Sequence, residues 1–585
     1  MRRRKTGELI CVSGLPWMPI IATGILALKA AFRRLYGHIY IISEDDIKLA
    51  LGISVAAAFA IFLKNMLWFN TQKRIGLLTW MQKFDYETGV LTDRKIRAMY
   101  PEISREYLSA EPDGLVLGRK GRDFVRVMME PGHIFNTIIM GAPGVGKSVL
   151  LLTYLIYQFH RKPDRHINPT TIFALDVKPE LAYKSVIIRG NKSVHTMNID
   201  DRMSYGWDVY YNLDPDSSDD DVMSELDVIA RALIDAGSAD KNEFFYQTAR
   251  NIFIGILLFT FKQGKSFIQG LIYILDTGVS EAMSQILQYV EGKVEYRNVR
   301  RLLDPYKGKK GEAFEDVEMT FRQSLSVFVK QDTQFFLDIN PRKASPKDLE
   351  SKISLFFLLR DNKLVEYKCL LRLITMQIMN HCSYRAEDSH MITLIIDEAY
   401  RLGVIDWIDF LSTSRSRNVA TILAFQSLSQ MHSLWGRDRT NSLLELCRVM
   451  AVFSCTTPDT ANTLSSWAGT YKEIRYSTND KGGTTKSYEE KKILEPSDIM
   501  TLQEQGEVIL FIKGRYFRTN VSRARYYMIP ELSIISKECL LKNKKEDKHY
   551  GPDRIHARID NRHQKSDAER IRNPHGSDND NCSKE

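Results

Sequence analysis

A glycine-rich run that ends in lysine and serine is the clearest chemical signal in this sequence. The run has the spacing G-x-x-x-x-G-K-[ST], follows a strand-like segment at 134–140 and precedes a helix-like segment that begins at Val149. Glycines let the backbone wrap a polyphosphate with its N–H groups pointing inward, and a helix N-terminus favours negative charge. We therefore expect a nucleotide site. It comprises Gly141, Ala142, Pro143, Gly144, Val145, Gly146, Lys147, Ser148 and Val149.

Lys147 and Ser148 carry the chemistry within this loop. The lysine is expected to hold the β- and γ-phosphates, and the serine hydroxyl to ligate Mg²⁺. The expected cofactors are therefore ATP and Mg²⁺. The other glycine–lysine–serine run, 264–266, is not a second site, because Phe259 stands where its first glycine would be.

An acidic pair, Asp397 and Glu398, provides the partner of the loop. It follows the aliphatic run 391–396, which is typical of a strand buried on both faces of a parallel sheet. Sheets of this kind bind ligands at the carboxyl ends of their strands. We expect Asp397 to hold the Mg²⁺ shell and Glu398 to orient or deprotonate the attacking water. Without the loop motif, an acidic pair on the surface would be the better interpretation.

Two further strand ends are expected at the same edge. Residues 171–175 lead to Asp176, and residues 420–425 lead to Gln426, whose amide could sense the γ-phosphate or simply cap a loop. Arg415 and Arg417 precede the second of these strands. One of them could reach a neighbouring subunit's γ-phosphate as an arginine finger, or both could form a solvated basic turn. The sequence does not choose between the two arginines.

Composition narrows the class of protein. Apolar residues make up 44% of the 585 positions, enough for a large core, and the net charge of +9 permits contact with nucleic acid or anionic lipid without requiring it. The seven cysteines form no CxxC pair and no cluster with zinc spacing, so we expect reduced thiols and a cytosolic location for most of the chain. No HExxH motif is present, which argues against a zinc protease.

The first 75 residues are expected to anchor the chain in a membrane. Residues 9–28 carry no charge after a basic start, and twenty helical residues span about 30 Å. A second apolar segment covers 49–69. The alternatives are a cleaved signal peptide for the first segment and a buried helix for the second. We expect two spans in the inner or plasma membrane, with the ATPase part in the cytoplasm.

The remainder divides into four parts by composition. Residues 76–215 and 348–535 are expected to form the two halves of one α/β nucleotide-binding domain, because 353–359, 448–455 and 507–519 resume a strand pattern. Residues 216–347 show helical spacing and little strand character, which predicts an all-helical insert. Residues 536–585 are highly charged without periodicity and predict a disordered tail.

Taken together, these motifs resemble the coupling proteins of type IV secretion, the TraD/TraG group of conjugation systems. The resemblance rests on the two N-terminal spans, the loop 141–148, the segments 176–180 and 242–251, the acidic pair, and the segments 426–430, 458–462 and 511–515. Pro179 departs from the glycine that is common there, and Ala399 and Tyr400 replace a common phenylalanine-containing continuation.

The resemblance implies a fold, an activity and partners. It implies a RecA-like P-loop domain with an all-helical inserted domain, a homo-hexamer, and ATP-driven export of single-stranded DNA with its relaxase through a type IV secretion channel. The insert would then read the relaxosome. Two alternatives remain open: a substrate-docking receptor that uses ATP only for assembly, and an FtsK-like pump for double-stranded DNA.

Overall fold

The fold is described from a computed structural model of the whole chain. It describes residues 107–129, 134–160, 170–234, 243–308, 312–478, 484–512, 515–519 and 523–550, with a few helical positions between 45 and 56. The two predicted membrane spans, 9–28 and 49–69, fall almost entirely outside these residues. Within the described part of the chain, no helix is both long enough and apolar enough to cross a bilayer.

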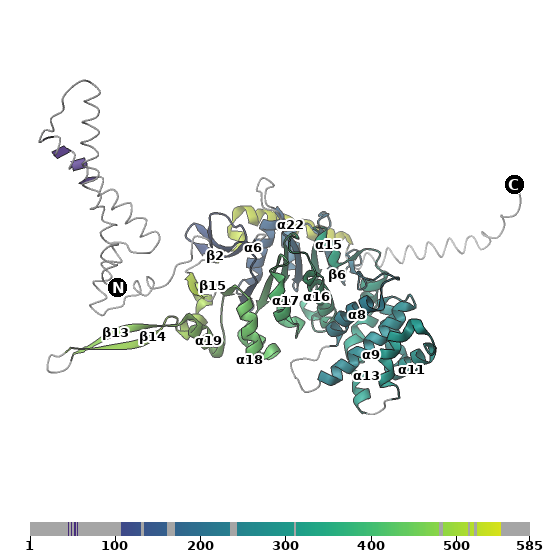
Figure 1. The fold of residues 1–585 in the computed structure, drawn as a ribbon. Coiled ribbons are helices and arrows are strands. Elements are labelled where there is room, and N and C mark those ends of the chain that lie inside the picture. Colours follow the sequence, from purple (N-terminus) through teal and green to yellow (C-terminus); the bar gives the residue numbers. More distant parts are fainter. Residues whose placement is uncertain are drawn as a thin grey trace, which may run out of the picture. The chain divides into compact units, whose positions relative to one another are not determined.

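A nine-stranded sheet forms the core of the larger of two compact units of the chain (Figure 1). Its strand order is β16-β15-β12-β4-β11-β10-β5-β9-β6. The run from β12 to β6 is parallel, and β15 and β16 extend it as an antiparallel pair. The strands are β4 (Thr137–Met140), β5 (Thr171–Asp176), β6 (Val194–Asn198), β9 (Ser354–Leu358), β10 (Ile392–Ile396), β11 (Val419–Phe425), β12 (Val449–Val452), β15 (Val508–Ile512) and β16 (Arg515–Thr519).

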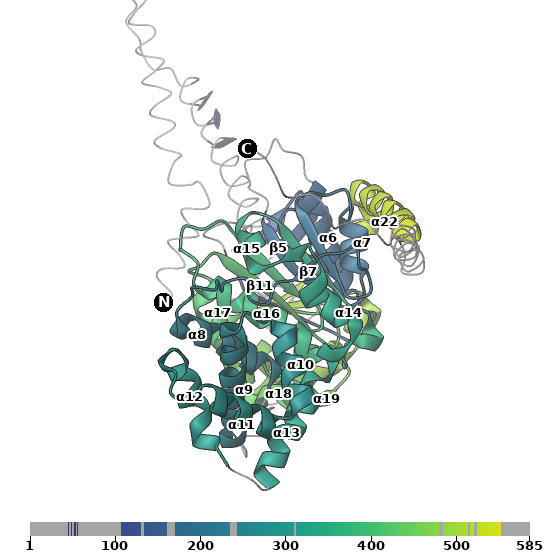
Figure 2. The same cartoon turned by 90° about the vertical axis from the view of Figure 1, so that its right-hand side faces the viewer.

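The central strands are buried along their whole length, which explains their uninterrupted apolar sequences. Helices α6 (Lys147–His160) and α7 (Glu180–Ser185) pack on one face, where Ile139, Ile172 and Ile395 join their core. Helices α16 (Lys368–Ser383), α17 (Trp407–Ser414) and α18 (Leu428–Leu446) cover the other face (Figures 1 and 2). The sheet is therefore a middle layer between helices, as expected for an α/β nucleotide-binding domain.

Smaller elements complete this part of the chain. A separate antiparallel sheet precedes the glycine-rich loop and has the order β1-β3-β2, from β1 (Leu108–Ser109), β2 (Leu115–Lys120) and β3 (Asp123–Val127). In the sequence, helix α19 (Pro458–Ala468) precedes a long antiparallel hairpin of β13 (Thr470–Thr478) and β14 (Thr484–Lys492), and helices α20 (Pro496–Met500) and α21 (Leu502–Gln505) follow it. The hairpin, 469–493, belongs to a compact unit separate from the one that holds the large sheet, and it was not predicted.

The segment predicted to be an all-helical insert folds largely as helices. Ser218 caps the first of them by accepting a hydrogen bond from the N–H of Asp221 at 3.2 Å, and Ser266 caps the third. The central helix, α9 (Glu243–Lys262), has fully buried side chains such as those of Phe253 and Leu257. The helices are α8 (Asp219–Leu233), α9 (Glu243–Lys262), α10 (Phe267–Thr277), α11 (Val279–Tyr289), α12 (Arg297–Leu303), α13 (Glu312–Leu325), α14 (Gln331–Gln334) and α15 (Pro346–Glu350), with a π-helical turn at Phe335–Ile339.

The predicted insert 216–347 is not purely helical, because residues 343–344 near its C-terminal end form a short strand, whose partner at 206–207 precedes the predicted start of the insert. Two-residue strands β7 (Gly206–Trp207) and β8 (Lys343–Ala344) pair where the chain enters and leaves it. Gly206 is required there, because a Cβ would lie 2.1 Å from the carbonyl oxygen of Phe336. The indole of Trp207 donates to Gln377 of α16 at 2.8 Å, which fastens this base to the nucleotide-binding domain.

The prediction of a disordered tail from residue 536 is wrong as far as residue 550. Helix α22 (Pro530–Tyr550) continues through this segment and packs on α6 and α7. Its buried stripe is Leu532, Ser536, Cys539 and Asn543, and half of these side chains are polar, so a search for apolar periodicity misses it. Residues 551–585 lie outside the described residues.

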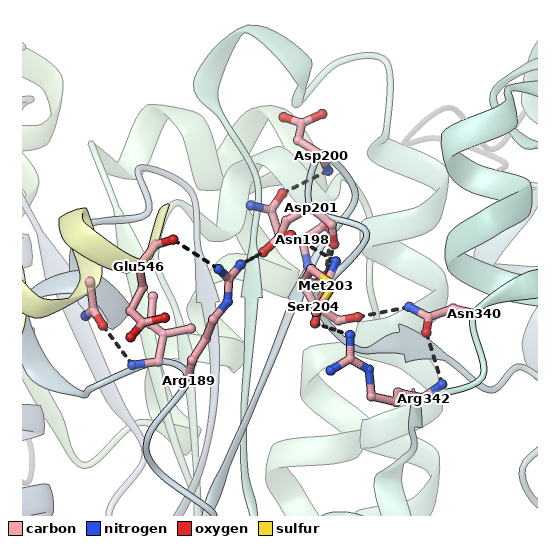
Figure 3. A network of polar contacts seen from close by, with 11 residues as sticks. Arg189, Asn198, Asp200, Asp201, Met203, Ser204, Asn340, Arg342 and Glu546 are labelled. Atoms are coloured by element: carbon pink, nitrogen blue, oxygen red, sulfur yellow. Dashed lines mark hydrogen bonds and ion pairs between the residues drawn. The ribbon is translucent and has the colours of Figure 1, made fainter. Parts of the chain in front are cut away.

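Hydrogen bonds to backbone groups replace apolar contacts in this helix. The amide of Asn543 donates to the carbonyls of Tyr183 at 2.9 Å and Val186 at 2.6 Å, and accepts from the N–H of Ile188 at 2.9 Å. Figure 3 shows the adjoining Arg189, whose guanidinium contacts the carboxylate of Asp201 and the main-chain carbonyl of Glu546. The end of α22 is therefore anchored to the loop that follows α7.

Candidate nucleotide site

Four neighbouring strand ends bring the predicted residues to one edge of the sheet. Strands β5, β10, β11 and β4 are adjacent and parallel, so their carboxyl ends share an edge. Asp176 ends β5, Asp397 follows β10, Gln426 follows β11 and Gly141 follows β4. The glycine-rich loop and the acidic pair, which are about 250 residues apart in sequence, thus meet in space.

The loop has the backbone that a phosphate cradle needs. Gly144 and Gly146 have positive φ angles of 80° and 104°, a region that other residues rarely adopt. Gly141 is required by close packing, since a Cβ would lie 2.8 Å from the Cγ2 of Val145. The Ser454 hydroxyl accepts from the N–H of Ala142 at 2.8 Å, so the segment directly after β12 also holds the loop in place.

Lys147 starts helix α6 and is nearly buried. Its ammonium donates to the carbonyls of Gly141 at 2.6 Å and Ala142 at 3.2 Å, which points it across the mouth of the loop. Burial lowers the pKa of Lys147, while the carboxylates of Asp397 and Glu398 oppose that shift. A cation held there beside carboxylates suits a ligand that carries several negative charges.

Ser148 and Asp397 form the candidate magnesium position. The serine hydroxyl donates to the carboxylate of Asp397 at 3.3 Å. Burial, and to a lesser extent the neighbouring Glu398, raises the pKa of Asp397 to about 6. Two converging oxygen donors are the kind of protein ligand that Mg²⁺ takes together with phosphate oxygens, and a bound cation would hold Asp397 ionised. The residues therefore fit Mg²⁺ with ATP.

Glu398 is held in a strained backbone conformation. Its φ of 63° places it in the left-handed region, which is uncommon for a non-glycine residue. Its carboxylate forms an ion pair with Arg401 at 3.4 Å, on the short helical turn that follows. The carboxylate of Glu398 lies close enough to Lys147 to influence that residue's pKa.

Two residues at this edge were not assigned a role from the sequence. Asp176 is fully buried, accepts from the N–H of Ala182 at 2.8 Å, and has its pKa raised to about 7, mainly by burial. Lys178 is half-exposed, and its charge influences the pKa values of both Lys147 and Asp397. Their position at the carboxyl end of a buried strand was the feature of the sequence that could have indicated a role for them in the site.

Gln426 lies at the same edge of the sheet as the glycine-rich loop, whereas the two arginines lie at the opposite edge. The N–H of Gln426 donates to the side chain of Gln430 at 3.0 Å, at the start of α18 and at the same edge as the loop. Arg415 and Arg417 precede β11 and so lie at the opposite edge of the parallel sheet, away from the nucleotide site of their own chain.

The structure distinguishes the two arginines from each other. Arg417 donates to the carbonyl of Arg385 at 2.8 Å, and Arg385 donates in return to the carbonyl of Arg417 at 2.8 Å. Arg415 is exposed at the end of α17. Arg417 thus holds its own chain together, whereas Arg415 faces solvent.

Comparison with known proteins agrees with this geometry. Residues 391–504 match the family described as the TraM recognition site of TraD and TraG. This segment runs from β10 to α21 and includes the acidic pair and Gln426. A search of curated proteins by sequence gives no match.

Solved structures share the fold. The bacterial conjugative coupling protein TrwBdeltaN70, in its unbound monoclinic form, aligns with a TM-score of 0.53 at 16% identity over 73% of this chain and 91% of that one. TrwB in complex with the non-hydrolysable ATP analogue ADPNP aligns with a TM-score of 0.52 at 16% identity, over 74% and 92%. The resemblance to type IV coupling proteins of the TraD/TraG group is confirmed, and the α/β domain with its helical domain is a fold that this chain shares with the solved coupling proteins.

Proposed function

We propose that this chain is a membrane-anchored ATPase that recruits the relaxase–DNA complex and drives single-stranded DNA into a type IV secretion channel during conjugation. The observation that carries the proposal is the meeting of Ser148 and Asp397 beside Lys147 on a coupling-protein fold. A docking surface alone would not need these groups at one edge of the sheet.

Each residue has a role in ATP hydrolysis under this proposal. Lys147 would neutralise the β- and γ-phosphates, and Ser148 and Asp397 would hold a Mg²⁺ ion, which would supply Lewis-acid stabilisation of the phosphate charge. Glu398 orients a water molecule and accepts its proton, and Gln426 contacts the γ-phosphate. Pro143 and Val149 belong to the loop and helix start that surround the phosphates.

A homo-hexamer would complete the site. Arg415 lies at the edge of the sheet opposite to its own P-loop, so it could act only on the nucleotide of a neighbouring subunit. A finger of this kind stabilises charge on the transferred phosphoryl group. We propose Arg415, rather than the internally bonded Arg417, for this role.

The membrane anchor and the location are also proposals. The uncharged run 9–28 and the apolar run 49–69 would span the inner or plasma membrane, with both ends and the ATPase in the cytoplasm. The formal charge of +9 is compatible with a DNA partner.

A docking receptor that uses ATP only for assembly is the second candidate. The observation in its favour is the family match, whose name describes a recognition site rather than a motor. The two candidates share every nucleotide-site residue and differ in whether DNA stimulates ATP turnover.

Steady-state ATPase measurements on the detergent-solubilised full chain would decide between them. We expect single-stranded DNA to raise turnover, and Lys147→Ala and Glu398→Gln each to abolish it. Tight ATP binding with turnover that neither single- nor double-stranded DNA changes would favour the docking receptor. Faster turnover with double-stranded DNA alone would favour an FtsK-like pump.

A further inference from the structure

Helix α22 exposes a row of aliphatic side chains to solvent. Its opposite side packs on α6 and α7, where Leu532 and Cys539 are buried. Ile534 and Leu541 point outward and are 67% and 62% exposed, and a spacing of seven residues places them in line along the helix axis. Met528, two residues before the helix, is also 62% exposed. A row of this kind differs from the single apolar residues scattered over most protein surfaces, and it indicates a contact with something partly apolar.

Four exposed lysines flank this row on a helical projection. They are Lys537, Lys544, Lys545 and Lys548. None of them forms an ion pair with another residue that the structure describes. The acidic residues at the margin of the face are Glu531 and Glu538, and the second of these is neutralised by an ion pair with Lys542 at 2.6 Å. The outward face of α22 is therefore an apolar line within a field of unneutralised positive charge.

This pattern fits an anionic membrane surface better than a nucleic acid. A basic amphipathic helix lies in the plane of the membrane interface, with its aliphatic side chains at the boundary of the acyl chains and its lysines at the lipid phosphates. The phosphates of DNA would also attract the lysines, but a phosphate backbone offers no apolar surface to Ile534 and Leu541. The aliphatic row therefore distinguishes between the two anionic partners.

The chain enters this compact unit beside α22. Tyr107, at the start of the unit's described part, is buried in the same hydrophobic cluster as Leu532 of α22. The expected membrane spans, 9–28 and 49–69, precede it in the sequence. Figures 1 and 2 show α22 at the opposite end of this unit from helices α9, α11 and α13 of the insert. The segment that leads from the expected anchor therefore arrives at the side of the unit that carries α22.

We propose that the outward face of α22 binds the headgroups of anionic phospholipids in the membrane that holds the N-terminal anchor. Ile534 and Leu541 enter the interface, and the four lysines contact lipid phosphates. The surface is small, but the anchor raises the effective concentration of lipid beside it, as in any two-point attachment. The contact orients the ATPase unit so that the insert points away from the bilayer. The proposal rests on the membrane anchor proposed above and adds a second contact with the lipid.

Lysine acetylation read by mass spectrometry tests this contact on the full-length protein in lipid nanodiscs. The nanodiscs contain phosphatidylcholine, either alone or mixed with phosphatidylglycerol. The attraction of one lysine to an anionic surface corresponds to about a fivefold effect, so we expect the four lysines to react about fivefold more slowly in the anionic nanodiscs. Lys352 is the internal control, because it is exposed in the turn before β9, and it should react equally in both.

Leu541→Asp is the test variant, because a carboxylate within the aliphatic row would be repelled by lipid phosphates. We expect it to restore the reactivity of the four lysines in anionic nanodiscs to the level measured in phosphatidylcholine. Val365→Asp is the matched control, since it makes the same kind of change at an aliphatic side chain that is 81% exposed before α16. It should leave the difference between the two lipids unchanged. Both variants should unfold at the wild-type temperature, because both side chains are exposed.

Equal reactivity of the four lysines in the two kinds of nanodisc would overturn the lipid contact and leave the anchor in place. Protection by single-stranded DNA, but not by phosphatidylglycerol, would overturn it in favour of a nucleic-acid surface. Protection in both lipids that is lost on dilution of the protein would overturn it in favour of a second copy of the chain. Failure of the folded full-length protein to enter nanodiscs would overturn the proposed anchor as well.

Discussion

Replacing Asn543 by alanine should release the end of α22 from the body of the protein. The side chain is 1% exposed and forms three hydrogen bonds with the backbone around α7. Each bond contributes about 1 kcal/mol, and a backbone group left buried without a partner costs about 1–3 kcal/mol. We therefore expect the free energy of local opening to fall by about 3 kcal/mol, which corresponds to roughly a hundredfold.

Hydrogen exchange detected by mass spectrometry measures this opening directly. The amide of Ile188, which donates to the Asn543 side chain, and the amides in the second half of α22 should exchange about a hundredfold faster in Asn543→Ala. Lys544→Ala is the control, because that side chain is exposed on the same helix and should leave the exchange unchanged. Unchanged exchange in Asn543→Ala, or equally fast exchange of 538–550 in the wild-type protein, would refute the docking of this helix.

Three further predictions concern the nucleotide site. Burial raises the pKa of Asp176 to about 7, from about 4 in an unfolded chain, so the folded protein binds that proton more tightly and loses stability as pH rises between these values. Asp176→Asn keeps a hydrogen-bond acceptor at this position but does not titrate. It should therefore reduce the loss of unfolding free energy between pH 5 and pH 8, which is at most about 4 kcal/mol, when thermal unfolding is compared at these two pH values. An unaltered pH dependence would contradict this prediction. Ser148→Ala should weaken ATP binding about tenfold with Mg²⁺ and not at all with EDTA, and equal weakening in both would argue against a magnesium ligand. Arg415→Ala should lower ATP turnover about a thousandfold without changing ATP affinity, whereas Arg417→Ala should lower the unfolding temperature; the opposite pattern would assign the finger to Arg417.

The strand ends that carry the site residues were predictable, because a change in residue type along the chain marks the carboxyl end of each of these strands. The strands before Asp176, Asp397 and Gln426 are buried on both faces, which leaves a short aliphatic run that ends abruptly in a polar residue. Parallel pairing then puts all such ends at one edge without further information. For the same reason, the grouping of these side chains at one edge of the sheet could be predicted without knowing the order of the strands.

Other features depend on contacts that no local pattern records. The buried stripe of α22 contains Ser536 and Asn543, whose partners are backbone groups, so its composition is that of a solvated segment. Arg523 meets Val145 across 378 positions, and the spacing of its own segment carries no sign of this. The choice between Arg415 and Arg417 required the reciprocal bonds with Arg385, which lies on a different connection of the sheet.

The pairing of β7 with β8 has a consequence for how this architecture can vary. The chain leaves the nucleotide-binding domain at Trp207 and returns beside it at Lys343, with the N–H of Gly206 donating to the carbonyl of Arg342 at 2.8 Å. The whole helical insert therefore leaves the nucleotide-binding domain and rejoins it at adjacent positions. The entropy cost of closing a loop grows only slowly with the length of the loop. Insertions into this helical module, deletions from it or its exchange for another would leave the strand order untouched, so the module could diverge between related proteins while the residues of the nucleotide site stayed the same.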